Sequence, residues 1–104
     1  MAKYELKRSP THPGEILRED FLSPLALTQT ELARALKTSF RTINEILNGK
    51  RSISPDMALR LGRCFGTSPD VWIGLQTEYD LYRARMKSQK TLSGIKPHRS
   101  MRAA

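Results

Sequence analysis

The chain has 104 residues, 38% of them hydrophobic, and a formal net charge of +8 from 18 Lys and Arg against 10 Asp and Glu. Such a length supports one domain with a short tail. No apolar run approaches the roughly 18 residues of a membrane span and no secretory signal opens the chain, so we expect a cytoplasmic protein. The single cysteine, Cys64, excludes an intramolecular disulfide and a cysteine-based zinc site.

The first predicted helix runs from about Pro13 to Leu22. Its inward side chains are expected to be Ile16, Leu17, Phe21 and Leu22. Ser23-Pro24 is predicted to end it, because the residue before a proline is disfavoured in the helical region. His12, just before the helix, is interpreted as a capping or surface residue.

Residues Thr28 to Gly49 read TQTELARALKTSFRTINEILNG, a pattern that predicts two short helices joined by a tight turn. The Thr28 hydroxyl and the Glu31 carboxylate can form a capping box at the start of the first helix. Ser39 is a good N-cap for the second helix, and Asn48-Gly49 supplies its end. Apolar residues recur at helical spacing in both: Leu32, Ala33, Leu36, Ile43, Ile46 and Leu47.

The second of these helices has a polar outer face opposite its apolar stripe. That face consists of Phe40, Arg41, Asn44, Glu45 and Asn48. Residues 34–51 also carry a net charge of +4, which is suited to phosphate contacts. The segment is therefore predicted to be a helix-turn-helix that places its second helix in the major groove of double-stranded DNA.

Two further helices are predicted from one start signal used twice, Ser54-Pro55-Asp56 and Ser68-Pro69-Asp70. The first runs from Pro55 to Phe65 and ends at Gly66. The second runs from Pro69 to about Met86. The body is therefore expected to be all-α, with five helices.

The last predicted helix carries a stripe at alternating steps of three and four residues: Trp72, Leu75, Tyr79, Tyr82 and Met86. The stripe either packs on the chain's own core or forms, in its C-terminal part, a homodimer interface. We favour the interface and assign it to four residues: Leu75, Tyr79, Tyr82 and Met86. Gly74 inside this helix is consistent with close approach of another backbone or with a helix irregularity.

The chain divides into an N-terminal arm (1–10), a helix-turn-helix domain (11–86) and a basic tail (87–104). The tail contains five basic and no acidic residues, which leaves a net charge of +3 on residues 1–86. Its Ser, Lys, Arg, Gly and Pro content predicts a flexible, disordered segment. It is either a solvated terminus or an arm that follows DNA or folds on a partner protein.

Several segments resemble the HigA/VapI-type antitoxins of the phage-repressor-like (Xre) helix-turn-helix superfamily: HPGEILREDFL, the helix-turn-helix, ILNGKRSISPDMALRL, FGTSPDVWIGLQ and YDL. The resemblance covers about residues 10 to 83. It implies a five-helix phage-repressor-like domain, a homodimer, and binding to a palindromic operator, commonly the protein's own promoter. It also implies neutralisation of a HigB-like toxin of the RelE kind, which cleaves messenger RNA. The alternative is a stand-alone Xre-family regulator with no toxin partner.

The resemblance also implies site residues. Base-reading positions correspond to Ser39, Phe40, Arg41, Asn44 and Glu45. Phosphate-binding positions correspond to Thr28, Gln29, Asn48, Lys50 and Arg51. Arg41 suits guanine, Asn44 adenine and Glu45 cytosine N4, while the Phe40 ring can touch a thymine methyl. Glu45 can alternatively pair with Arg41 one helical turn earlier.

Three positions depart from the family pattern. Lys37 stands where glycine is frequent in the turn, Thr38 where an apolar residue is common, and Phe40 where a polar reader is common. Phe40 either faces DNA or turns inward to replace the missing apolar contact. No phosphate loop, metal-ligand spacing or nucleophile motif is present, so we expect neither an enzyme nor a bound cofactor or metal.

Overall fold

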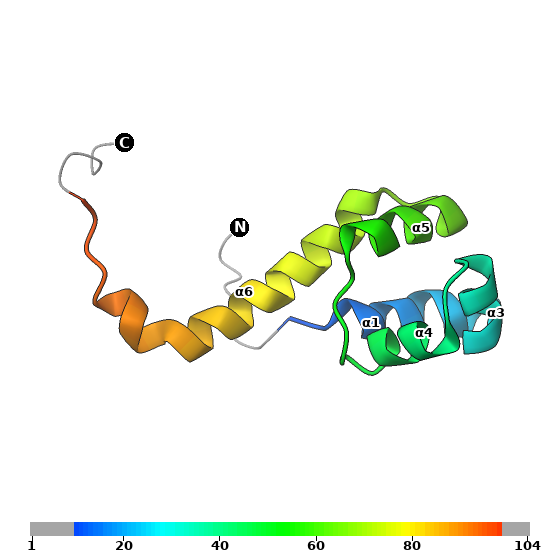
Figure 1. Ribbon diagram of the computed structural model, residues 1–104, viewed down its shortest axis with the longest axis horizontal. Helices are drawn as coiled ribbons and strands as arrows, with labels where there is room; N and C mark the ends of the chain where they lie inside the picture. Colours follow the sequence, from blue (N-terminus) through cyan, green and yellow to red (C-terminus); the bar gives the residue numbers. More distant parts are fainter. Residues whose placement is uncertain (1–9, 99–104) are drawn as a thin grey trace.

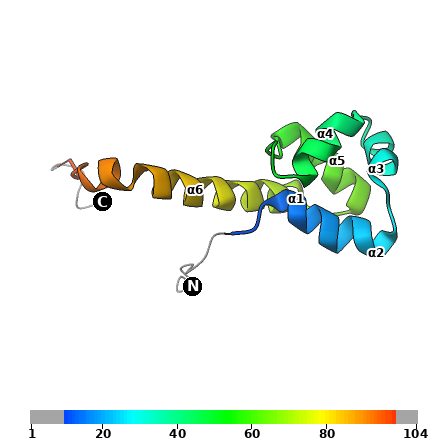
Figure 2. The same cartoon turned by 90° about the horizontal axis from the view of Figure 1, so that it is seen from below.

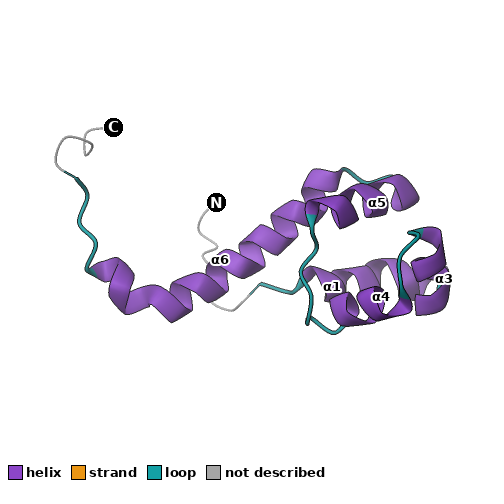
Figure 3. Ribbon diagram, in the orientation of Figure 1, coloured by secondary structure: helices purple, strands orange, loops and turns teal. Residues whose placement is uncertain are grey.

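The computed structural model describes residues 10–98, and in this range every regular element is helical. Figures 1 and 3 show the arrangement. The elements, in chain order, are α1 (Pro13–Ile16), η2 (Leu17–Leu22, a π-helix), α2 (Ser23–Leu25), α3 (Gln29–Ala35), α4 (Phe40–Leu47), α5 (Pro55–Phe65) and α6 (Pro69–Ser93). Because α1, η2 and α2 follow one another without a break, they form one rod, and the predicted five-helix, all-α fold is confirmed.

The first rod is longer than predicted. The expected end at Ser23-Pro24 is wrong, since helical backbone continues through Ser23 to Leu25. Proline has no N–H to donate and crowds the preceding turn of an α-helix. Here that turn is the wider π-helix, in which the Ser23 N–H donates to the Arg18 carbonyl. The rod ends at Ala26, whose φ of 52° is left-handed.

Apolar side chains from all the longer helices meet in one core. The residues with almost no exposed surface are Leu17, Leu32, Ile43, Ile46, Ala58, Leu61 and Trp72. Phe21 packs against both Phe65 and Trp72, with ring centroids 4.8 and 5.3 Å apart. This core joins the first rod directly to the α5–α6 pair, and α4 also lies against the rod.

Two glycines allow close packing within this core. A Cβ added to Gly14 would collide with the Ile46 carbonyl oxygen, so α1 lies directly against the backbone of α4. A Cβ on Gly62 would come within 2.7 Å of the Thr67 oxygen. The first contact matters for the site, because it fixes the rod against the end of α4.

Both Ser-Pro-Asp signals begin helices as predicted. The Ser54 hydroxyl accepts from the Met57 N–H, and the Ser68 hydroxyl accepts from the Asp70 N–H. Helix α5 ends at Gly66, whose φ of 74° is the left-handed conformation that favours glycine.

Helix α6 continues to Ser93, so the predicted end near Met86 and the start of a disordered tail at Lys87 are wrong for residues 87–93. Apart from Leu92 these residues are polar, but Lys, Gln and Leu are good helix formers and no proline or glycine occurs among residues 87–93. Figure 2 shows the C-terminal half of α6 projecting away from the other helices. The tail beyond residue 98 and residues 1–9 of the N-terminal arm lie outside the described residues.

Candidate nucleic-acid interface

The caps predicted for the helix-turn-helix are present. The Glu31 N–H donates to Thr28 Oγ1 and the Thr28 N–H donates to Glu31 Oε1, each at 3.0 Å, which completes the capping box of α3. The Thr42 N–H donates to Ser39 Oγ at 3.0 Å at the start of α4. Gly49 has a φ of 73° and follows the end of α4. Both helices therefore begin where a side-chain oxygen accepts from a free backbone N–H, and α4 is followed by a left-handed glycine.

The turn between α3 and α4 is held from α5. Lys37 has a left-handed φ of 54°, which explains why glycine is frequent at this position in the family pattern. Arg60 Nη1 donates to the carbonyl oxygens of Leu36 and Lys37, both at 2.9 Å. Arg60 also pairs with Asp56 at 2.9 Å. The guanidinium of Arg60 thus stabilises the carbonyl groups at the end of α3 and at Lys37, the left-handed residue of the turn.

The outer face of α4 is open to solvent. Phe40 is 51% exposed, so it does not turn into the core, and that alternative is wrong. The Arg41 side chain is 83% exposed. Asn44 and Glu45 are half-buried, and Asn48 is exposed at the end of the helix. The face is therefore accessible along its whole length.

One group on this face is a three-residue ion cluster. Glu45 Oε2 lies 3.0 Å from Arg41 Nε, and Glu45 Oε1 lies 2.8 Å from Arg51 Nη2. Hydrogen bonds from Arg41 and then Arg51 lower the pKa of Glu45 below its ordinary value of 4.5. The surface pair with Arg41 that the sequence left open is thus formed, and Arg51 is added to it from the segment after α4.

A second group joins the start of α3 to the end of α4. Asn44 Nδ2 donates to Gln29 Oε1 at 3.0 Å, and Asn48 Nδ2 donates to Asn44 Oδ1 at 3.2 Å. Gln29 and Asn48, which are both expected to bind phosphate, are therefore linked through Asn44, which is expected to read a base.

The remaining predicted residues lie at the margin of these groups. Ser39 and Thr28 are exposed and use their hydroxyls as helix caps. Lys50 is exposed in the segment after α4. These three residues make no side-chain contact with either group in the described part of the chain.

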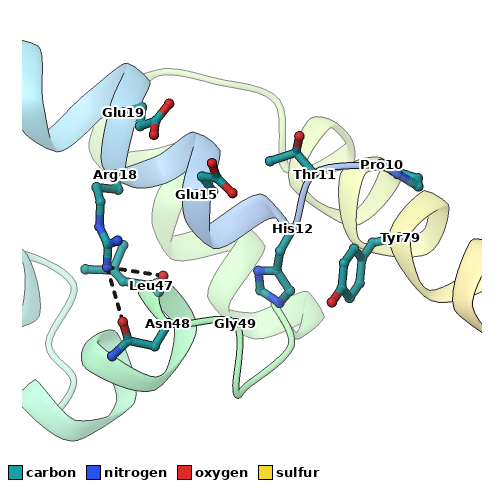
Figure 4. Close-up of a pocket in the computed structure, with 10 residues that line it drawn as sticks. All are labelled: Pro10, Thr11, His12, Glu15, Arg18, Glu19, Leu47, Asn48, Gly49 and Tyr79. Carbon is teal, nitrogen blue, oxygen red and sulfur yellow. Dashed lines mark hydrogen bonds between the residues drawn. The ribbon is translucent and has the colours of Figure 1, made fainter. Parts of the chain in front are cut away.

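Two unpredicted residues hold the site or the segment next to it. Arg18, on η2, donates from Nη2 to the Leu47 carbonyl at 3.2 Å and to Asn48 Oδ1 at 3.4 Å (Figure 4). Gln76 on α6 is 5% exposed, and its Oε1 accepts from the Ile53 N–H at 2.8 Å. The sequence by itself assigns no role to Arg18 or Gln76, because no local pattern connects residues so distant in the chain.

A polar hollow beside Arg18 lies between the first rod, the end of α4 and α6 (Figure 4). His12 lies within it, its ring 4.9 Å from the Tyr79 ring in an edge-to-face contact. His12 Nδ1 accepts from the Gly14 N–H at 2.8 Å, which caps α1. Burial lowers the pKa of His12, while the charge of Asp80 raises it less strongly. The capping role expected of His12 is confirmed.

The expected dimer residues divide into two groups. Leu75 packs against the chain's own core, Tyr79 contacts His12, and both side chains are half-buried within the single chain. Tyr82 is half-buried, and Met86 is 57% exposed on the projecting half of α6. The C-terminal part of the stripe, at Met86, is therefore the more exposed part.

Over residues 10–98, no group of His, Cys, Asp and Glu side chains is arranged to hold a metal ion. In the same range, no helix is both long enough and apolar enough to cross a membrane.

Comparison with known proteins agrees with this arrangement. A family described as "Helix-turn-helix" matches residues 17–72. Virulence-associated protein I of Dichelobacter nodosus is 49% identical over 78 residues, which cover 75% of this chain and 72% of that protein. Antitoxin HigA-1 of Vibrio cholerae is 32% identical over 91 residues, covering 88% and 86% of the two chains.

The fold is shared with a solved structure that contains DNA. Pseudomonas aeruginosa antitoxin HigA, determined with the higBA promoter, superposes with a TM-score of 0.82 at 48% sequence identity. The match covers 86% of this chain and 98% of the other.

Proposed function

We propose a function on the premise that this chain belongs to the helix-turn-helix family of HigA- and VapI-type proteins: it is a sequence-specific DNA-binding repressor and an antitoxin. In this proposal a homodimer binds a palindromic operator in the cytoplasm, commonly in its own promoter. The same protein neutralises a HigB-like, messenger-RNA-cleaving toxin encoded beside it.

The observation that carries the DNA-binding part is the continuous polar surface of α4. It places Arg41, Asn44 and Glu45 on one accessible face, with Gln29 hydrogen-bonded at one edge and Arg51 paired at the other. The similar P. aeruginosa HigA was solved with its promoter, which supports using this face for DNA. Base contacts are assigned to Ser39, Phe40, Arg41, Asn44 and Glu45, and phosphate contacts to Thr28, Gln29, Asn48, Lys50 and Arg51.

The ion cluster sets how the arginines are used. Glu45 holds Arg41 and Arg51 on the helix surface in the free protein, and such solvent-exposed ion pairs are weak enough to be exchanged when DNA binds. On DNA, Arg41 exchanges its carboxylate for guanine O6 and N7, and Arg51 exchanges it for a phosphate. Glu45 is then released to accept from cytosine N4.

The decisive experiment for base reading compares Arg41→Ala with Lys50→Ala on the promoter operator and on random duplex. Arg41→Ala is expected to lose about 1–3 kcal/mol on the operator and much less on random DNA. Lys50→Ala, which removes a phosphate contact, is expected to weaken both duplexes alike. Equal losses from Arg41→Ala on both duplexes would rule out base reading by this residue.

The antitoxin part is supported by the similarity to antitoxin HigA-1 of V. cholerae. Its test is expression of the neighbouring reading frame with and without this chain. We expect growth arrest by the neighbour alone, with rescue and a co-purifying complex when both are present. A neighbour that does not affect growth would favour the second candidate, a stand-alone regulator with the same DNA face.

A further inference from the structure

A series of side-chain hydrogen bonds crosses the DNA face from the first rod to the start of α3. Arg18 Nη2 donates to Asn48 Oδ1 at 3.4 Å, and Asn48 Nδ2 donates to Asn44 Oδ1 at 3.2 Å. Asn44 Nδ2 then donates to Gln29 Oε1 at 3.0 Å. We name these four residues the amide relay. They come from η2, the C-cap of α4, α4 itself and the first position of α3.

The guanidinium decides which way each amide in the relay faces. Arginine has donors and no acceptor, so Asn48 must turn its oxygen toward Arg18. The Asn48 nitrogen is then left for Asn44, which receives it on its oxygen. Asn44 consequently turns its own nitrogen toward Gln29. Reversing any one amide would place two N–H groups or two oxygens against each other.

Arg18 is itself held in place. Its Nη2 also donates to the Leu47 carbonyl at 3.2 Å, so it is bonded to both the backbone and the C-cap side chain of α4 (Figure 4). The rod that carries Arg18 lies close to α4, because Gly14 has no Cβ to collide with the Ile46 carbonyl. The charged end of the relay is thus attached to a fixed part of the fold.

The direction of the relay determines what it offers to DNA. Gln29 accepts from Asn44 through its oxygen, so its Nε2 group presents donors outward, and no residue within 10–98 bonds to it. Phosphate oxygens only accept, so this is the orientation that a phosphate contact requires. Asn44 keeps one N–H and one oxygen lone pair, which match adenine N7 and N6–H.

We propose that Arg18 is a positioning residue for DNA recognition: through Asn48 it fixes the orientation of Asn44 and Gln29 on the reading face. This inference rests on the proposed function, since it requires α4 to read DNA. The inference gives a role to Arg18, a residue outside the helix-turn-helix, which acts by setting the orientation of the side-chain amides in the relay.

The test removes the cation and measures base preference. Arg18→Met takes away the donors while keeping an unbranched side chain, and Arg18→Lys keeps a donor-only cation. Arg63→Met on α5, an exposed position outside the relay, makes the same charge change as a matched control. Each protein is titrated with the operator, with operators carrying single base-pair changes, and with random duplex. Circular dichroism melting establishes that each variant is folded.

Arg18→Met is expected to weaken operator binding by about three- to tenfold, which is the range for one lost hydrogen-bond arrangement. It is also expected to reduce the difference in affinity between the correct and the wrong base at one base pair per half-site. Arg18→Lys is expected to recover most of that difference. If Arg18→Met is not folded, Asn48→Ala breaks the relay at the next step and is expected to give the same reduction. The proposal is overturned if the base preferences of the variants equal those of the wild type and of Arg63→Met.

A readout without DNA separates this inference from the proposed function. Nuclear Overhauser effects from the Asn44 side-chain N–H protons in free wild-type protein are expected to reach Gln29 rather than Asn48. In Arg18→Met this order is expected to be lost. An amide order that is unchanged in Arg18→Met would overturn the positioning role. A wild-type protein that does not distinguish operator from random DNA would instead contradict the proposed function.

Discussion

Among the glycines of the described chain, Gly14 is the one at which an added Cβ would meet the nearest atom, because α1 lies against the backbone of α4. Gly14→Ala is expected to destabilise the fold by about 1–3 kcal/mol, the range for overpacking a fixed contact. Gly74→Ala is the matched control, since a Cβ there meets nothing within 4 Å inside the described chain. It is expected to stabilise α6 by about 0.5–1 kcal/mol. Urea unfolding measures both, and a neutral Gly14→Ala would contradict the close contact.

His12 makes stability depend on pH. Its neutral Nδ1 caps α1, and burial lowers its pKa below the ordinary 6.5. The unfolded chain therefore binds the proton more readily, so the contribution of His12 is complete above pH 6.5 and is lost as pH falls through the lowered pKa.

His12→Asn keeps a good N-cap that does not titrate. Between pH 7 and pH 5 the unfolding free energy of the wild type is therefore expected to fall more than that of His12→Asn. Denaturant titrations across this interval measure the difference between the two proteins. A difference that does not change with pH would show that folding does not lower the pKa of His12.

Among the elements, the turn between α3 and α4 stores strain at Lys37. A non-glycine residue in the left-handed region costs about 1–2 kcal/mol in the folded state. Glycine removes part of this strain, but it also increases the conformational entropy of the unfolded chain, which offsets some of the gain. Lys37→Gly is accordingly expected to be neutral or to stabilise by up to about 1 kcal/mol. Ala35→Gly, at the exposed end of α3, is expected to destabilise by up to about 1 kcal/mol. Thermal unfolding compares the two, and an equal loss in both would contradict the strained turn.

Contacts between elements connect the reading face to α6. Gln76 accepts from the Ile53 N–H and donates from Nε2 to Asp80 Oδ1 at 3.0 Å. It therefore fixes the segment between α4 and α5, which carries Lys50 and Arg51. Because the oxygen and the nitrogen of the buried Gln76 amide are both hydrogen-bonded, this segment has little conformational freedom.

At the scale of the whole molecule, the projecting half of α6 offers an exposed, partly apolar surface to a second chain. Its exposed large apolar side chains in the described range are Leu81, Met86 and Leu92. We propose that they and Tyr82 form the homodimer interface, in place of the wider set that included Leu75 and Tyr79. Sedimentation at micromolar concentration is expected to give twice the 11.8 kDa chain mass.

Met86→Asp is expected to convert the dimer to a folded monomer, because it places a charge in the interface without touching the core. Leu59→Asp is the control: Leu59 is 60% exposed, close to the 57% of Met86, and belongs to α5, a helix that lies away from the projecting half of α6 (Figure 1). It is expected to leave the dimer intact. A dimer that survives Met86→Asp would place the interface elsewhere.

Local signals were strong enough to predict most of the fold. The caps at Thr28, Ser39, Ser54 and Ser68 and the glycine at position 66 act within one helical turn, so the sequence identifies them directly. The two errors both concern helix ends. Ser23-Pro24 was a valid stop signal that a π-turn overrode, and the polar residues after Met86 were good helix formers interpreted as disordered.

By itself, the sequence determined the helix-turn-helix and the polar outer face of α4, because caps and periodicity depend on neighbours along one chain. Only the tertiary structure decided how that face is organised. Arg18 lies on a different helix from Asn48, and Arg51 meets Glu45 across the end of α4. Such contacts depend on where the core places separate helices, and that placement follows from packing against Gly14 and the buried apolar residues rather than from any local pattern.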